Sequence, residues 1–112
     1  MIIAVDFDGV LCQHKFPEIG ESNHIIIALL KSIHKDGNKL ILWTCRGGKY
    51  LKDAVDWCKS YGLEFDAVNE DVDEIKNSEF GKDKSVKVHA DIFLDDRCLN
   101  VSWLGLLVGQ KG

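Results

Sequence analysis

Several features that direct a chain to a membrane or out of the cell are missing from this sequence of 112 residues. Its apolar runs fall short of the roughly 20 residues that a membrane-spanning helix needs. The opening stretch, MIIAVDFDG, has neither the basic region nor the long apolar core of a signal peptide. The four cysteines are widely spaced and form no C-x-x-C pair, which favours free thiols over a disulfide framework. We therefore expect a cytoplasmic protein that does not interact with membranes.

The common nucleotide-binding and calcium-binding loops are also absent. No G-x-x-x-x-G-K-[ST] or G-x-G-x-x-G pattern occurs. An EF-hand loop started at Asp6 would place Pro17 at its twelfth position, where glutamate is required. The net charge of −4 argues against a broad nucleic-acid-binding face, so nucleic acid is expected only as a substrate end. A zinc site made of Cys12, His14 and Cys45 is an alternative metal centre.

Apolar residues follow two alternating patterns along the chain. Short continuous runs, typical of buried strands, alternate with stretches of three-and-four spacing, typical of amphipathic helices. This alternation predicts a parallel sheet with helices on its faces, in a single domain that spans residues 1–112. The expected strands lie at 2–5, 40–43, 65–69 and 90–96, and the expected helices lie between Ser22 and Gly37 and between Leu51 and Gly62.

Polar side chains follow three of these strands. The first strand runs into Asp6 and Asp8, the second into Thr44, and the fourth into Asp95 and Asp96. Because the carboxyl ends of parallel strands share one edge of a sheet, ligands bind in the crevice beyond that edge. Carboxylates crowded there repel one another unless a cation lies between them. Ligands that are all oxygen atoms suit a hard ion, Mg²⁺ before Ca²⁺ or Zn²⁺.

Such an edge suits phosphoryl transfer, because a metal ion beside a free carboxylate offsets the charge of a phosphate. Asp6 could attack phosphorus and form an aspartyl-phosphate. Asp8 could protonate the leaving oxygen and later accept a proton from water. These two residues and Thr44 are therefore the expected catalytic groups after the first two strands.

The phosphate needs hydrogen-bond donors and a balancing positive charge. Thr44 can donate its hydroxyl, and backbone N–H groups near Cys45 can complete an anion-binding nest. Arg46 has two interpretations, because it can contact the substrate or form a salt bridge with the acidic edge. One of three lysines before the fourth strand should neutralise phosphate and nucleophile. The closest to that strand, Lys87, is preferred over Lys84 and Lys82.

Four segments resemble, in order, the motifs of the haloacid dehalogenase-like (HAD) hydrolase superfamily: DFDGV, LWTCR, a lysine and IFLDDR. The resemblance runs over residues 2–97. It implies a Rossmann-like, three-layer α/β/α sandwich, with Asp6 as the nucleophile and Asp8 as the general acid and base. It also implies that Mg²⁺ is held by Asp6, the backbone carbonyl of Asp8, Asp95 and Asp96. Aspartate at position 8 is typical of the phosphatases in the superfamily.

Many phosphatases of that superfamily carry a cap domain, and this chain has little room for one. Only 35 residues separate Asp8 from Thr44, and one predicted helix uses most of them. We therefore expect a capless, magnesium-dependent phosphomonoesterase, whose open site suits a bulky phosphorylated substrate or a covering partner subunit. Two alternatives stay open. One is a receiver-like phospho-acceptor signalling module, for which Asp66 is the aspartate nearest the third strand, and the other is a non-catalytic HAD-scaffold binding protein.

Overall fold

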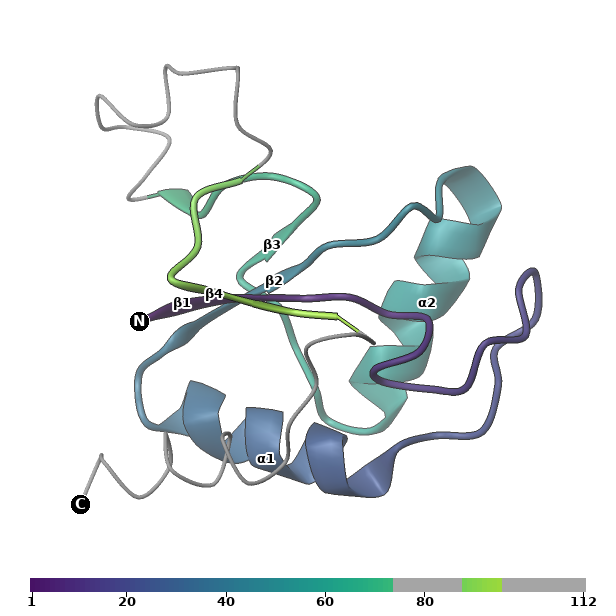
Figure 1. The fold of residues 1–112 in the computed structure, drawn as a ribbon, viewed down its shortest axis with the longest axis horizontal. Coiled ribbons are helices and arrows are strands. Elements are labelled where there is room, and N and C mark those ends of the chain that lie inside the picture. Colours follow the sequence, from purple (N-terminus) through teal and green to yellow (C-terminus); the bar gives the residue numbers. More distant parts are fainter. Residues whose placement is uncertain (74–87, 96–112) are drawn as a thin grey trace.

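The computed structural model describes residues 1–73 and 88–95, in which strands and helices alternate (Figure 1). Every predicted strand and both predicted helices are present, and the third and fourth strands are shorter than expected. None of the helices in this part of the chain is long and apolar enough to cross a membrane. The elements are β1 (Ile2–Val5), α1 (His24–Lys35), β2 (Lys39–Leu42), α2 (Gly48–Ser60), β3 (Ala67–Val68) and β4 (Ile92–Leu94).

The four strands form one parallel sheet in the order β3-β2-β1-β4. In its register, Val5 of β1 lies opposite Leu42 of β2 and Leu94 of β4. The chain moves from β1 through β2 to β3 in one direction and then returns to the other side of β1. This reversal makes the boundary between β1 and β4 a topological switch point, where open α/β sheets bind ligands. The predicted α/β fold with a Rossmann-like parallel sheet is confirmed.

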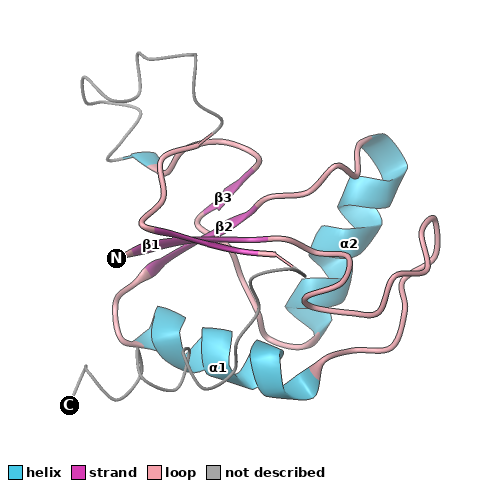
Figure 2. Ribbon diagram, viewed as in Figure 1, coloured by secondary structure: helices cyan, strands magenta, loops and turns pink. Residues whose placement is uncertain are grey.

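Both helices pack on the same face of the sheet (Figure 2). The β1-α1-β2 and β2-α2-β3 crossovers run in the same direction along the sheet, so right-handed connections place α1 and α2 together. Apolar side chains from the two helices meet alternate side chains of the strands in one buried core. Its members include Ile3, Val5, Leu40 and Leu42 from the sheet, Ile26, Leu30 and Ile33 from α1, and Ala54 and Cys58 from α2.

The opposite face of the sheet carries a second, smaller cluster, in which Ala4, Ile41 and Ala67 pack against Val72 and Val88. Val72 in the chain leaving β3 and Val88 in the chain entering β4, which is the light green segment in Figure 1, therefore both lie against this face. The described residues thus include the sheet and one of the two helical layers of the predicted three-layer sandwich. The other predicted helical layer is not found among them, and positions 74–87 and 96–112 lie outside the described residues.

The segment after β1 forms a tight turn and then a hairpin. The N–H groups of Val10 and Leu11 both donate to the carbonyl of Phe7, which closes a turn like that of a helix. The chain then doubles back from 13 to 21, where the Gln13 N–H donates to the Glu21 carbonyl at 2.9 Å. We call this segment the hairpin 13–21.

Helix α1 begins and ends as the sequence predicts. The side chain of Asn23 caps its N-terminus by accepting from the Ile26 N–H. The chain leaves the helix at Gly37, whose φ of +98° favours glycine. Between Asp8 and Thr44 the chain therefore contains one turn, the hairpin 13–21, α1 and β2, and no cap domain is inserted there.

Candidate active site

Two of the predicted carboxylates meet at the switch point of the sheet. Asp6 directly follows β1, and its N–H donates to the Leu94 carbonyl of β4 at 2.9 Å. Because Val5 is paired with Leu94, the next residues along the two strands, Asp6 and Asp95, are neighbours across the sheet. Both line one pocket of about 690 Å³, and Thr44 from the end of β2 lines it as well. The structure thus brings together one predicted side chain from each of three strands.

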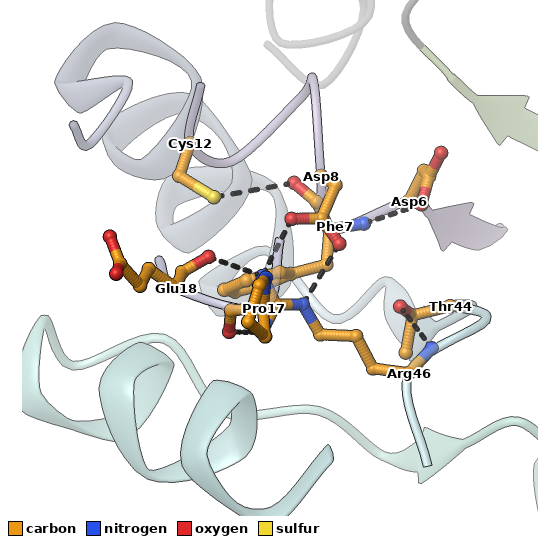
Figure 3. Close-up of polar contacts among 8 residues, drawn as sticks. All are labelled: Asp6, Phe7, Asp8, Cys12, Pro17, Glu18, Thr44 and Arg46. Atoms are coloured by element: carbon orange, nitrogen blue, oxygen red, sulfur yellow. Dashed lines mark hydrogen bonds and ion pairs between the residues drawn. The ribbon is translucent and has the colours of Figure 1, made fainter. Parts of the chain in front are cut away.

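The carboxylate of Asp6 is oriented by its own turn. One oxygen, Oδ1, accepts a hydrogen bond of 2.8 Å from the N–H of Phe7. Figure 3 shows that the Asp6 side chain points away from the group of side chains around Asp8. The two aspartates of the DFDGV segment therefore face different surroundings.

Asp8 is bound at both of its carboxylate oxygens by Arg46. The Arg46 Nε donates to Oδ2 at 2.9 Å, and one terminal nitrogen donates to Oδ1 at 2.8 Å (Figure 3). The Arg46 side chain is 1% exposed and the Asp8 side chain 15% exposed. The hydrogen bonds that Arg46 donates to Asp8 raise the pKa of the Arg46 guanidinium above its already high value, so the guanidinium stays charged. Of the two interpretations of Arg46, the structure has the salt bridge with the acidic edge.

The same guanidinium also contacts the hairpin 13–21. It donates to the carbonyl of Pro17 at 3.1 Å and to the carbonyl of Glu18 at 2.8 Å. Its carbon Cζ lies 4.9 Å from the ring centre of Phe7 and 5.0 Å from that of Phe16. Arg46 therefore joins the turn after β1, the hairpin and the segment after β2, which are distant in sequence.

Thr44 is held by two hydrogen bonds at the end of β2. Its N–H donates to the Asn69 side-chain oxygen at 2.8 Å, and its Oγ1 accepts from the Arg46 N–H at 3.1 Å. A hydroxyl has one hydrogen to donate, and the bond from Arg46 leaves that hydrogen to point to another acceptor. Sequence reasoning missed Asn69, which follows β3 with a φ of +54°. An asparagine as the last residue of the predicted strand 65–69 is a signal for such a conformation.

The described cysteines do not form a metal site. Cys12 is buried, and burial raises the pKa of its thiol, whereas Cys45 is exposed and lines the pocket beside Thr44. Within the two described ranges, no three His, Cys, Asp or Glu side chains are grouped to hold a metal ion. The described residues therefore give the zinc alternative no support. Of the predicted magnesium ligands, the described residues include Asp6, Asp95 and the backbone carbonyl of Asp8.

Several predicted site residues lie outside the described residues. They are Lys82, Lys84, Lys87 and Asp96, and they stay predictions.

The chain resembles a protein of known structure. No family model and no curated protein matches its sequence. A conserved protein from Bacteroides thetaiotaomicron is 35% identical and superposes with a TM-score of 0.80. The match covers 100% of this chain and 92% of that protein.

Proposed function

We propose that this chain, which belongs to the same family as the conserved Bacteroides thetaiotaomicron protein, is a magnesium-dependent phosphohydrolase that cleaves phosphomonoesters. The observation that carries the proposal is the shared pocket at the β1–β4 switch point, lined by Asp6, Thr44 and Asp95. It combines a carboxylate that can act as nucleophile, a second carboxylate that can hold a cation, and a hydroxyl that can bind a phosphate oxygen. The motifs that resemble those of HAD phosphatases agree with this assignment.

The donor atoms at the pocket fit a hard divalent cation. Asp6 and Asp95 are neighbours in the register and supply carboxylate oxygens. The backbone carbonyl of Asp8 is the third oxygen donor that the superfamily resemblance implies, and Asp96 is the fourth. When Mg²⁺ is bound, it would offset the negative charge that a phosphate brings to two carboxylates.

In the first step, a carboxylate oxygen of Asp6 attacks phosphorus, and the bond between phosphorus and the leaving oxygen breaks. Asp8 gives its proton to that oxygen, so the product leaves as an alcohol. In the second step, Asp8 takes a proton from water as the water oxygen attacks phosphorus. The bond to Asp6 then breaks, which releases inorganic phosphate and restores the Asp6 carboxylate.

Asp8 can carry a proton while it stays paired with Arg46. Each of its oxygens accepts one hydrogen bond from the guanidinium and keeps a second lone pair. The Thr44 hydroxyl, whose oxygen already accepts from the Arg46 N–H, is oriented to donate to a phosphate oxygen. Lys87 is the proposed source of additional positive charge.

The open site suggests the size of the substrate. No cap domain is inserted between Asp8 and Thr44, so no inserted domain from this part of the chain covers the pocket. We propose a substrate whose phosphate enters the pocket while the rest of the molecule, which can be bulky, stays outside.

A receiver-like phospho-acceptor is less compatible with the surroundings of Asp66. Asp66 precedes β3, and its Oδ2 accepts from the Leu40 N–H at 2.8 Å and lies 3.0 Å from His34 Nε2. These partners lie at the beginning of β2 and the end of α1, whereas the pocket lies beyond the ends of β1, β2 and β4. Phosphorylating Asp66 would disrupt these two contacts and would leave the Asp6 pocket without a role.

The test is the hydrolysis of p-nitrophenyl phosphate with Mg²⁺ and with EDTA. We expect turnover only with Mg²⁺, and we expect Asp6→Asn to lose roughly 1,000-fold or more of it, as when a nucleophile is removed. Lys52→Ala is the matched control, because Lys52 is exposed and forms an ion pair with Asp56, another exposed residue of α2. Wild-type turnover no faster than that of Asp6→Asn would overturn the proposal. Stable phosphorylation without turnover would favour the signalling module, and phosphate binding without either would favour the binding protein.

A further inference from the structure

Arg46 is buried, and its guanidinium donates hydrogen bonds to several neighbouring segments of the protein. Its guanidinium makes four hydrogen bonds, two to Asp8 and one each to the carbonyls of Pro17 and Glu18. An arginine has five N–H donors, so four of the five are engaged. With a side chain only 1% exposed, Arg46 is not available to contact a substrate in this conformation.

We propose that Arg46 is a positioning residue, which fixes the Asp8 carboxylate and the hairpin 13–21 as one rigid unit beside the active site. This inference rests on the proposed function, because the position of Asp8 matters for catalysis only if Asp8 transfers protons there. Arg46 acts through Asp8 and does not itself touch the substrate.

The bidentate geometry is what gives Arg46 this effect. Two parallel hydrogen bonds fix both the position and the plane of the Asp8 carboxylate, which one bond would not do. A lysine at position 46 would keep the positive charge but could not reproduce the planar fork. Charge and orientation can therefore be separated by comparing Arg46→Lys with Arg46→Met.

The contacts to the hairpin tie its position to the same group. The hairpin carbonyls of Pro17 and Glu18 accept from Arg46, and the Phe16 ring lies over the guanidinium and 5.3 Å from the ring of Tyr50 in α2. Without Arg46, the two carbonyls and the partly buried Asp8 carboxylate would lose their partners together. The hairpin and Asp8 should therefore loosen as a unit.

A misplaced Asp8 should affect substrates unequally. An alkyl phosphate needs a proton on its leaving oxygen, whereas p-nitrophenolate leaves readily without one. Damage to Asp8 should therefore slow an alkyl phosphate much more than p-nitrophenyl phosphate. A general loss of folded protein would slow both by the same factor.

The experiment compares kcat for β-glycerol phosphate and p-nitrophenyl phosphate in wild type, Asp8→Asn, Arg46→Lys, Arg46→Met and the Asp8→Asn/Arg46→Met double variant. We expect Asp8→Asn and Arg46→Met to lose on the order of 100-fold on the alkyl ester and under about tenfold on the aryl ester. Arg46→Lys should lie between wild type and Arg46→Met. The double variant should be no worse than the worse single variant, since both changes remove one interaction. Equal losses on the two esters, or multiplied losses in the double variant, would overturn the inference.

A second readout does not depend on activity. Amide hydrogen exchange in the hairpin 13–21, including the Gln13 N–H, should accelerate in Arg46→Met and Asp8→Asn and stay unchanged in Lys52→Ala. Unchanged hairpin exchange in Arg46→Met would contradict the coupling even if activity falls. If Arg46→Met does not fold, Arg46→Lys carries both assays, with the same comparison against wild type. If wild type hydrolyses neither ester, the proposed function fails, and the exchange data alone decide whether Arg46 couples the hairpin to Asp8.

Discussion

The two aspartates that follow β1 are only two positions apart, but they have different surroundings. Asp6 lines an open pocket with Asp95 and Thr44, whereas both oxygens of Asp8 are bound by the buried Arg46. Asp8 lies inside the turn that is closed on the Phe7 carbonyl, whereas Asp6 continues the strand. One short motif thus supplies a carboxylate that lines the pocket and a carboxylate that Arg46 holds in a fixed orientation.

The difference between Asp6 and Asp8 is tested most directly by replacing each carboxylate in turn. Asp6→Asn should lose turnover by about 1,000-fold or more, while it leaves the urea unfolding midpoint close to that of wild type. Asp8→Asn should lose less activity on p-nitrophenyl phosphate, but it should also destabilise the protein, because Arg46 loses its charged partner inside the structure. Measuring kcat and urea unfolding for both variants checks this, and an active Asp6→Asn with an inactive Asp8→Asn would reverse the assignment.

Removing the buried partner should cost stability even without any assay of activity. Arg46→Met leaves the Asp8 carboxylate unpaired in a partly buried position, and we expect a loss of about 3–5 kcal/mol in the free energy of unfolding. The exposed pair Lys52–Asp56 is the contrast, since Lys52→Ala should leave the unfolding midpoint unchanged. Equal unfolding midpoints for Arg46→Met and Lys52→Ala would mean that the buried pair stabilises the fold no more than the exposed pair does.

A smaller effect is expected at Asn69, whose side chain holds Thr44 beside the Asp6 pocket. Asn69→Gly keeps the backbone conformation at a φ of +54° but removes the hydrogen bond to the Thr44 N–H. We expect it to cost about 1 kcal/mol of stability and to weaken the inhibition by inorganic phosphate. Inhibition constants and urea unfolding check this. Unchanged phosphate inhibition would show that Asn69 does not act through Thr44.

Much of this could be predicted from the sequence, because it depends on local patterns. The apolar run of β1, the three-and-four spacing of α1 and the order of strands and helices fix a parallel sheet, and the sheet then brings Asp6 and Asp95 together. The short β3 was less predictable. Side chains on both sides of it, Asp66 and Asn69, bond to the backbone of β2 and its continuation in place of a longer ladder.

The ion pair of Asp8 with Arg46 could not be chosen from the sequence alone, because the two residues are 38 positions apart. An arginine that follows a strand can bind either a substrate or an acidic side chain of the protein, and the sequence does not distinguish the two. The hairpin 13–21 favours the ion pair, because two of its backbone carbonyls accept hydrogen bonds from Arg46. This hairpin has no periodic pattern of apolar residues from which its position could be predicted. Such contacts depend on the path of the chain and not on the residue types.

A further small effect concerns Cys58, in the core between the sheet and the helices. Burial raises the pKa of the Cys58 thiol to about 12, while a thiol in the unfolded chain ionises near 9. Above pH 9 the unfolded state loses this proton and the folded state keeps it, so stability should fall as the pH rises from 9 towards 12. We expect a loss of about 1 kcal/mol between pH 9 and pH 10, measured by urea unfolding. Cys58→Ala should reduce this slope, and an identical slope would contradict the assignment to Cys58.

In the proposed reaction Asp6 itself forms a bond to phosphorus, and chemical trapping tests this directly. The protein is mixed with p-nitrophenyl phosphate and Mg²⁺, quenched in acid within the first turnovers and digested for mass spectrometry. We predict a phosphoryl group on the peptide that contains Asp6, located on that residue by fragmentation and absent from Asp6→Asn. A phosphoryl group on Asp8 or on any other residue, or turnover without a phosphorylated peptide, would contradict the account.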